Sequence, residues 1–230
     1  MEAATRKPQK DLSRRFDEVL NTGGHFARLF PIATSPRIAG FFTAAKELQT
    51  LARTIGEYSP TLVPGLLQTP GYARAVFAAA RRFSSAEEIE TWVVARMARA
   101  EIFARPQALK YWAVIDEAVL RRPVGGAAAM REQLAHLAGM IRSRKAVVQV
   151  LPFSAGAHAL LEGSVCLMTF EDAPPTVYLE GPHVGQLLDD PQMVGDVMLS
   201  YDLVRADALS QEASLTLIES AAEEYAHEQG

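Results

Sequence analysis

Glu117 and Arg121 form the first pair of side chains in this 230-residue sequence whose spacing could support chemistry. Glu117 stands where a predicted strand, residues 108–116, passes into a short helix, and Arg121 follows one helical turn later. Opposite charges four residues apart pair on one helical face, and ligands commonly bind where the strands of an α/β sheet end. The pair is therefore either an ion pair that fastens the helix to the sheet, or part of a site in which a partly desolvated Glu117 acts as a base or binds an amine.

A second candidate is His158, which lies in the glycine-flanked loop SAGAHALLEG after a predicted buried strand. Loops at strand ends are enriched in functional residues, although a lone histidine is also commonly a hydrogen-bonded structural residue. Glu162, Glu180 and His183 fall in neighbouring predicted loops and could form a carboxylate–imidazole cluster with His158. If the chain is an enzyme, we expect its catalytic acids and bases to be Glu117, His158 and Glu180.

Polar side chains also flank an apolar turn that contains Pro64 and Gly65. An apolar turn with a few polar tips is typical of the wall of a small-molecule pocket, and equally of a packed connection between helices. Arg96, on a predicted helix, could bind an anionic ligand or pair with acidic residues elsewhere in the chain. The candidate ligand-binding residues of the whole sequence are Tyr58, Gln68, Tyr72, Arg96, Arg121, Glu162 and His183.

The common metal and nucleotide motifs are missing from the sequence, which has no CxxC, no HExxH, no acidic calcium loop, no GxGxxG and no Walker-type phosphate loop. We therefore predict no metal site and no cofactor. The single cysteine, Cys166, alternates with apolar neighbours on a predicted strand, so we expect a core side chain and not a nucleophile. It cannot form an internal disulfide, and no apolar run approaches the roughly 20 residues that cross a bilayer, so we expect a cytoplasmic protein without a membrane partner.

The elements that must position these residues follow a mixed pattern, and we predict an α+β fold with helices packed on a small, roughly four-stranded mixed sheet. Thr69 and Pro70 are typical of a helix start, and Ser85 with Glu88 forms a predicted capping box. Helices are predicted over 11–20, 41–58, 70–82, 86–104 and 127–143 and from 191 onward. Strands are predicted over 108–116, 146–152, 164–170 and 176–180, the last two as a hairpin.

Three motifs carry a resemblance to a known family: PGLLQT at 64–69, DEAVLRR at 116–122 and LPFSAGAH at 151–158. With further matches they make residues 11–220 resemble the WhiJ-like regulators of actinobacteria. These are helix-turn-helix transcription factors, described as antitoxin-like, whose C-terminal half is catalogued as a domain of unknown function. The resemblance implies that this region senses a small molecule or a small partner protein, and that it forms a homodimer.

In WhiJ-like regulators a DNA-binding domain precedes this region. Residues 1–40 look like only the last helix of that domain and the linker behind it, and residues 41–230 like the sensor-type α/β domain, so we expect no sequence-specific DNA binding by this chain. Two functions stay open. One is a sensing domain of a WhiJ-like regulator. The other is a stand-alone biosynthetic enzyme that performs cofactor-independent acid/base chemistry, such as cyclisation, isomerisation or elimination, in secondary metabolism.

Charge is distributed unevenly along the chain. Residues 1–145 hold 22 Lys and Arg against 13 Asp and Glu, a balance of +9, whereas residues 146–230 hold 1 against 14, a balance of −13; together these give the net charge of −4. We expect the two parts to be complementary, within the chain or across a dimer, and the association to be sensitive to salt.

Overall fold

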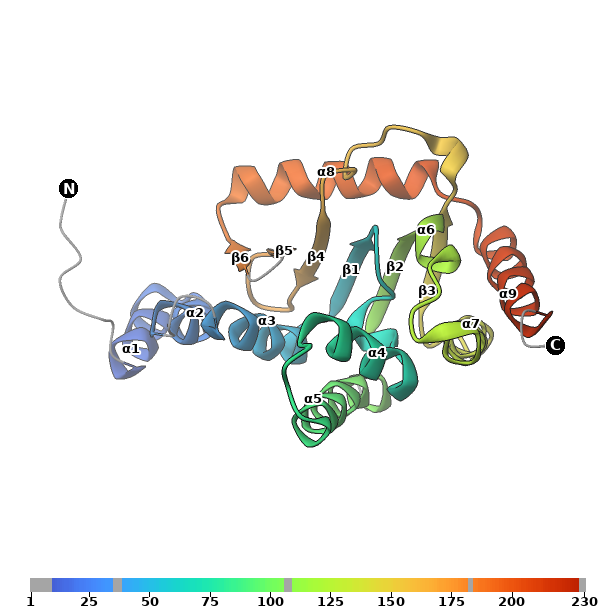
Figure 1. The fold of residues 1–230 in the computed structure, drawn as a ribbon. Coiled ribbons are helices and arrows are strands. Elements are labelled where there is room, and N and C mark those ends of the chain that lie inside the picture. Colours follow the sequence, from blue (N-terminus) through green and yellow to red (C-terminus); the bar gives the residue numbers. More distant parts are fainter. Residues whose placement is uncertain (1–9, 35–38, 106–108, 182–183, 228–230) are drawn as a thin grey trace. The chain divides into compact units, whose positions relative to one another are not determined.

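The computed structural model describes residues 10–34, 39–105, 109–181 and 184–227. Within these ranges, no helix is both long and apolar enough to cross a membrane. The α-helices are α1 (Lys10–Leu20), α2 (His25–Thr34), α3 (Ala39–Leu51), α4 (Pro70–Ala80), α5 (Ala86–Arg99), α6 (Glu117–Arg121), α7 (Gly126–Arg142), α8 (Pro191–Asp207) and α9 (Gln211–His227) (Figure 1). The strands are β1 (Thr54–Ser59), β2 (Lys110–Asp116), β3 (Val147–Leu151), β4 (Ser164–Thr169), β5 (Thr176–Gly181) and β6 (Val184–Leu188), and short 3-10 helices cover Gly65–Leu67, Ala100–Ala104 and Phe153–Ala155.

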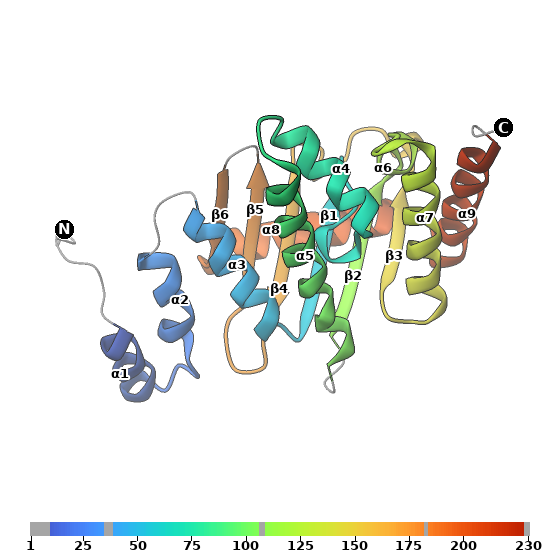
Figure 2. The same ribbon diagram turned by 60° about the horizontal axis from the view of Figure 1, so that its bottom comes forward.

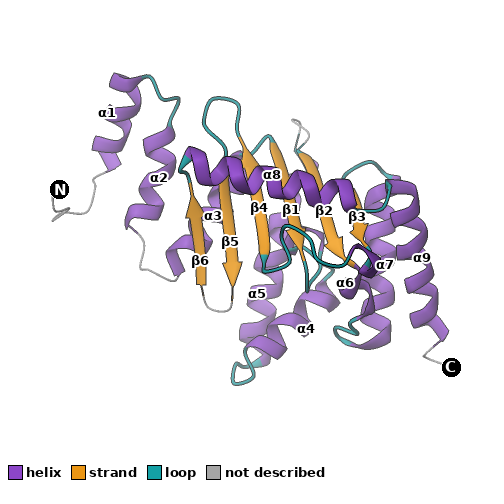
Figure 3. Ribbon diagram, turned by 90° about the horizontal axis from the view of Figure 1, so that it is seen from above, coloured by secondary structure: helices purple, strands orange, loops and turns teal. Residues whose placement is uncertain are grey.

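The six described strands form a mixed sheet in the order β3-β2-β1-β4-β5-β6 (Figure 3). β2 and β3 are parallel, and Asp116 lies opposite Leu151 at their carboxyl ends. β5 pairs in antiparallel fashion with both β4 and β6. The predicted α+β class is confirmed, and so is the hairpin of β4 and β5. The prediction of roughly four strands is wrong, because it missed β1 and β6.

Strand β1 takes the place of the last part of a predicted helix. The apolar spacing over 41–58 predicted one continuous helix, but α3 ends at Leu51. Just beyond it, the backbone N–H of Arg53 donates to the carbonyl oxygen of Thr169 at 2.8 Å, so the backbone leaves the helix and enters the sheet. The β-branched Ile55, near the start of β1, is fully buried and suits a strand better than a helix.

Strand β6 extends the β4–β5 hairpin by a third strand. Its register places Leu188 opposite Val177 and Gln186 opposite Leu179. The strand is five residues long, and its first residue, Val184, is exposed. A run this short cannot be distinguished from a loop by apolar spacing alone, which is why the sheet was predicted to end at residue 180.

The chain divides into two compact units, residues 1–55 with 163–199 and residues 56–162 with 200–230. The predicted boundary between residues 40 and 41 stays a prediction. In the first unit, α3 contacts β6, and α2 contacts both α1 and α3. Cys166 of β4 is buried in this unit, and the Gln49 Nε2 atom donates a hydrogen bond to its Sγ atom at 3.6 Å. The cysteine is therefore a core side chain, as predicted.

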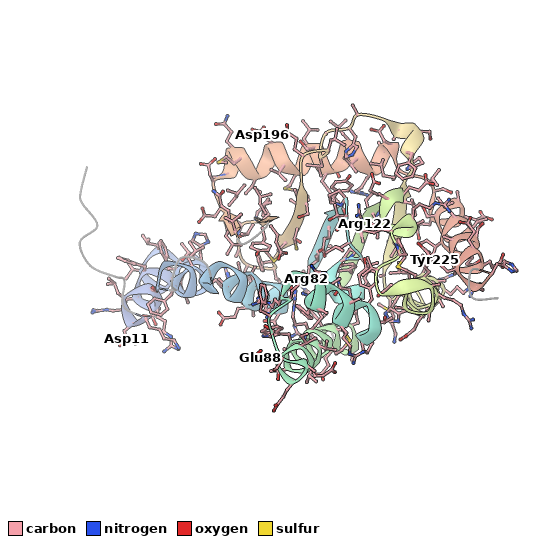
Figure 4. All side chains as sticks on the ribbon, in the orientation of Figure 1. Asp11, Arg82, Glu88, Arg122, Asp196 and Tyr225 are labelled. Carbon is pink, nitrogen blue, oxygen red and sulfur yellow. The ribbon has the colours of Figure 1, made fainter. Side chains whose placement is uncertain are left out.

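The second unit contains the parallel strands and most of the helices that surround them. α7 and α9 lie side by side, and α9 also packs on β3 (Figure 2). The fully buried Ser214 hydroxyl of α9 accepts a hydrogen bond from the Val150 backbone N–H at 2.9 Å, which ties this helix to the strand. α4 and α5 form a helical hairpin whose turn covers residues 81–85; Figure 4 labels Arg82 in this turn and Glu88 in the first turn of α5. Ser85 and Glu88 form the predicted capping box at the start of α5.

Candidate functional site

The carboxyl ends of β2 and β3 are the part of the second unit at which several predicted candidates meet. Because the two strands are parallel, Asp116 of β2 and Leu151 of β3 lie at the same edge of the sheet. After Asp116 the chain turns directly into α6, and the Asp116 carboxylate accepts a hydrogen bond from the Ala118 N–H at 2.8 Å as the helix N-cap. After Leu151 the chain forms the loop 152–162, which carries His158.

His158 is hydrogen-bonded to Tyr58, a fully buried residue of β1. The Tyr58 Oη and His158 Nε2 atoms are 3.0 Å apart, and the two rings meet edge to face with their centroids 5.2 Å apart. On the other side of the imidazole, the Leu160 backbone N–H donates to His158 Nδ1 at 3.3 Å. Because Nδ1 is an acceptor, the neutral imidazole carries its proton on Nε2 and donates it to the Tyr58 hydroxyl oxygen.

The surroundings of Tyr58 keep its hydroxyl group protonated. Burial raises the pKa of Tyr58 well above its usual value, and the negative charge of Asp116 raises this pKa further. Tyr58 is therefore a neutral phenol at physiological pH, which can donate a hydrogen bond or a proton but cannot act as a base. The pair thus combines a buried phenol with an imidazole that is half-buried in a loop.

Both carboxylate oxygens of Glu117 have protein partners. Oε1 accepts a hydrogen bond from Arg121 Nη2 at 3.3 Å, and Oε2 accepts one from the Phe153 backbone N–H at 3.1 Å. Arg121 also donates from Nη1 to Glu224 Oε2 at 2.6 Å. Glu117 therefore fastens α6 to the loop after β3, and Arg121 continues the connection to α9. We call the following group, which gathers around the carboxyl ends of β2 and β3, the strand-end site: Tyr58, Asp116, Glu117, Phe153 and His158.

Three other predicted ligand-binding residues hold the apolar turn in place. The Gln68 side chain donates from Nε2 to the Val63 carbonyl oxygen at 2.8 Å and accepts a hydrogen bond from Arg96 Nη1 at 2.7 Å. The Val63 backbone N–H donates to the Tyr72 hydroxyl oxygen at 3.1 Å, and Tyr72 is fully buried. These contacts are those of a packed connection between helices.

Gln133 belongs to the same group, although it was not among the predicted candidates. It is fully buried on α7, and its amide bonds the backbone of the turn twice: Oε1 accepts from the Thr69 N–H, and Nε2 donates to the Leu67 carbonyl oxygen, each at 2.7 Å. The sequence does hold a signal, since Gln133 lies three residues after Met130 and four before Leu137, and therefore on the apolar face of a predicted helix. We call this group the turn network, which comprises Val63, Gln68, Tyr72, Arg96 and Gln133.

Residues 42–220, which include the strand-end site and the turn network, match the family model described as Domain of unknown function (DUF5753). The chain belongs to this family. No curated protein and no solved structure matches it.

The remaining candidates of this DUF5753 chain fall in different segments of the sequence, in part outside the described residues. Glu162 is exposed at the end of the loop that carries His158. Glu180 is exposed on β5 in the first unit, where its backbone carbonyl oxygen accepts a hydrogen bond from the Ser164 hydroxyl at 3.1 Å. His183 lies outside the described residues. The predicted cluster of these residues with His158 therefore stays a prediction.

Among the described residues of the DUF5753 chain, no group of three or more His, Cys, Asp and Glu side chains is arranged to hold a metal ion. The polar atoms of the strand-end site point instead to hydrogen-bonding chemistry. Tyr58 supplies a phenol, and His158 supplies an imidazole whose two nitrogen atoms differ in role. Glu117 holds the loop that carries His158.

Proposed function

We propose that this chain is a sensing domain of the WhiJ-like type that binds a small molecule at the strand-end site. The observation that supports the proposal most directly is the hydrogen bond between Tyr58 and His158, which ties a half-buried loop residue to a fully buried strand residue. A ligand whose polar group replaces Tyr58 or His158 in this hydrogen bond removes one of the contacts that hold the loop 152–162. Binding is thereby coupled to the conformation of the loop, as a sensor requires.

The chemistry around the pair suits a small organic ligand. Sites for small molecules combine apolar surface with a few polar groups, and in α/β sheets they lie beyond the carboxyl ends of the strands. Phe153 and Leu161 supply exposed apolar surface in the loop that carries His158. The hydroxyl of Tyr58 and the imidazole of His158 supply the polar groups.

A thermal-shift screen against a panel of metabolites tests this proposal. At a ligand concentration about 100 times the Kd, binding stabilises the native state by about 2.7 kcal/mol, which for a chain of this size raises Tm by roughly 5–10 °C. We expect His158→Ala to lose most of this shift. The matched control is His136→Ala, an exposed histidine of α7, which we expect to respond as the wild type does. A panel without any stabilising compound, or an equal shift in His158→Ala, would contradict the proposal.

The same hydrogen bond favours a second candidate function, a cofactor-independent enzyme. A neutral phenol can donate its proton to a substrate, and the Nε2–H of His158, which already donates to the Tyr58 oxygen, then stabilises the phenolate until it takes a proton back from the substrate or from water. Glu117, the first predicted base, fits this role less well, because both of its oxygens accept hydrogen bonds from Arg121 and Phe153. In this mechanism Tyr58 is the acid, and His158 is the hydrogen-bond donor that stabilises its phenolate.

Turnover separates the two functions. An enzyme converts a compound that stabilises the wild type into a new product, and Tyr58→Phe then keeps binding but loses turnover by roughly 100-fold or more. A sensing domain returns the compound unchanged. Mass spectrometry of each stabilising compound after prolonged incubation with the protein distinguishes these outcomes.

A further inference from the structure

The Tyr58–His158 pair of the strand-end site contains two hydrogen-bond donors and one oxygen atom. The Leu160 backbone N–H donates to His158 Nδ1 at 3.3 Å, so the neutral imidazole carries its proton on Nε2. Nε2 lies 3.0 Å from the Tyr58 hydroxyl oxygen and donates to it. The oxygen is therefore the acceptor in this hydrogen bond, which leaves the proton of the Tyr58 hydroxyl group unused.

The Tyr58 O–H proton has no acceptor among the residues that the structure describes, where His158 is the one hydrogen-bond partner of this hydroxyl group. The charge of the Asp116 carboxylate raises the pKa of Tyr58, but this carboxylate accepts its hydrogen bond from the Ala118 N–H and not from Tyr58. Tyr58 is fully buried, and a buried donor without an acceptor is unfavourable. A ligand that brings an acceptor to this hydroxyl group therefore gains affinity from it.

A carbonyl oxygen matches the two donors of the pair. It has two lone pairs, so it can accept from the Tyr58 O–H and from His158 Nε2–H at the same time. A ligand hydroxyl group brings a further proton that needs its own acceptor, and an ammonium group has no lone pair to offer. Two donors directed at one oxygen are also the arrangement by which oxyanion holes bind carbonyl groups.

The charges near the pair are unfavourable for an anionic acceptor. The negative charge of Asp116 acts on the Tyr58 hydroxyl group. The loop 152–162, which carries the imidazole, contains one Glu and no Lys or Arg. Arg121 of α6 is already ion-paired with two glutamates. A carboxylate or phosphate oxygen at this position is repelled by Asp116, whereas an uncharged carbonyl oxygen is not.

We propose that the strand-end site binds an uncharged carbonyl compound with an apolar body, whose carbonyl oxygen accepts hydrogen bonds from the Tyr58 hydroxyl and from His158 Nε2. This inference rests on the proposed function, since it names the class of ligand for the same site. Phe153 and Leu161, both 58% exposed, supply apolar surface for the body of the ligand. The ligand oxygen replaces the Tyr58 oxygen as the acceptor of the Nε2–H, so binding changes the contact that ties the loop to β1.

Three small compounds that share a phenethyl body test this chemistry: benzylacetone, hydrocinnamate and phenylpropylammonium. They differ in the polar group, which is an uncharged ketone, a carboxylate and an ammonium group. Each is titrated to about 10 mM into the isotope-labelled full chain, and the backbone amide signals of residues 152–162 are followed by NMR. For compounds of this size we expect a Kd of roughly 1–10 mM for benzylacetone, and weaker binding of the other two by about fivefold or more.

Variants of the two donors show whether the carbonyl oxygen binds where we propose. Tyr58→Phe is expected to weaken the binding of benzylacetone by about threefold to tenfold, the usual value of one hydrogen bond, and His158→Ala by about tenfold or more. The matched control is Tyr225→Phe, at a buried tyrosine of α9, which should bind benzylacetone as the wild type does.

The results separate this inference from the proposed function. Binding of hydrocinnamate or phenylpropylammonium as tight as that of benzylacetone, and lost in His158→Ala, would overturn the inference and leave the proposed function in place. Benzylacetone that leaves the loop signals unchanged, or that binds Tyr58→Phe as it binds the wild type, would also overturn the inference. The thermal-shift screen decides the proposed function independently, because its panel is not restricted to carbonyl compounds.

Discussion

The turn network and the strand-end site were both predicted as candidate ligand sites, and they differ in how completely the protein itself occupies their polar groups. In the turn network, Gln133 is fully buried and binds the backbone of the turn with both ends of its amide, while Gln68 binds Val63 and Arg96. In the strand-end site, His158 is half-buried in a loop and meets Tyr58 through one side-chain hydrogen bond.

The difference shows why similar residue types lead to different roles. A polar side chain whose donors and acceptors bind the backbone of its own fold contributes to stability and has little left to offer a ligand. A polar pair that joins a loop to a strand through one contact can exchange that contact for another at small cost. This contrast supports a structural role for the turn network and the binding proposed at the strand-end site, and the following variants test this division.

The largest effect is expected for Gln133→Leu. Leucine fills a similar volume, but it leaves the Thr69 N–H and the Leu67 carbonyl oxygen buried without their partner. Each such group costs about 1–3 kcal/mol, so we expect the two together to lower the free energy of unfolding, measured by urea denaturation, by about 2–6 kcal/mol. Gln192→Leu, at an exposed position of α8, is the matched control and should change this free energy by less than about 0.5 kcal/mol. A loss below 1 kcal/mol in Gln133→Leu would remove the distinction between the two regions.

Alkaline pH provides a second comparison, because each region buries one tyrosine. Burial raises the pKa of Tyr72 as it does that of Tyr58. Folding thus favours both neutral phenols, and their stabilisation is complete below pH 10.0, the ordinary tyrosine pKa. Above this pH the unfolded chain ionises first, so stability falls by up to about 1.4 kcal/mol per pH unit for each tyrosine.

Substitutions by phenylalanine separate the two contributions. Asp116 raises the pKa of Tyr58 further, whereas the Val63 N–H opposes the rise for Tyr72. Tyr58→Phe is therefore expected to remove more of the alkaline slope than Tyr72→Phe, in urea denaturation repeated from pH 8 to pH 11. The reverse order would mean that the stronger desolvation lies in the turn network.

Local signals in the sequence predicted much of the fold. The Thr69 N-cap, the capping box at Ser85 and the start of α6 after Asp116 depend on neighbouring residues, and all three are present. β1 was missed because pairing with distant backbone makes it a strand, and β6 because apolar spacing alone cannot distinguish a run of five residues from a loop. The apolar spacing over 41–58 is helical throughout. The change from helix to strand depends on the hydrogen bond between the Arg53 N–H and the distant Thr169 carbonyl oxygen, which the local sequence does not indicate.

The candidate site was predictable only in its parts. Tyr58 and His158 were both predicted as candidates, each for a separate reason. Their contact could not be predicted, because 100 residues separate them and no spacing rule connects them. Gln133 was not predicted as a member of the turn network, because its partners Leu67 and Thr69 lie more than 60 residues away in the sequence. Its place on the apolar face of the predicted helix indicates burial, but the backbone groups that its amide binds are set by the fold and not by the local sequence.

A smaller effect is expected for Glu117→Ala in the strand-end site. The substitution removes the acceptor of the Phe153 N–H and releases Arg121, but these groups are partly exposed and water replaces their partners. We expect a loss of about 0.5–1.5 kcal/mol in the free energy of unfolding, together with faster hydrogen exchange in the loop 152–162. Glu223→Ala, at an exposed carboxylate of α9, should change neither quantity. Unchanged exchange in the loop would show that Glu117 does not hold it.

An effect of similar size concerns the Tyr58–His158 hydrogen bond itself, which a double-mutant cycle isolates. Tyr58→Phe, His158→Ala and the double variant, compared by urea denaturation, should give a coupling energy of about 0.5–1.5 kcal/mol, the usual value of one hydrogen bond. This is less than the loss expected for Gln133→Leu, since one contact is broken at a half-buried position and not two in the core. A coupling energy of 3 kcal/mol or more would place the pair with the stabilising network and leave the strand-end site too rigid to exchange that hydrogen bond for a ligand.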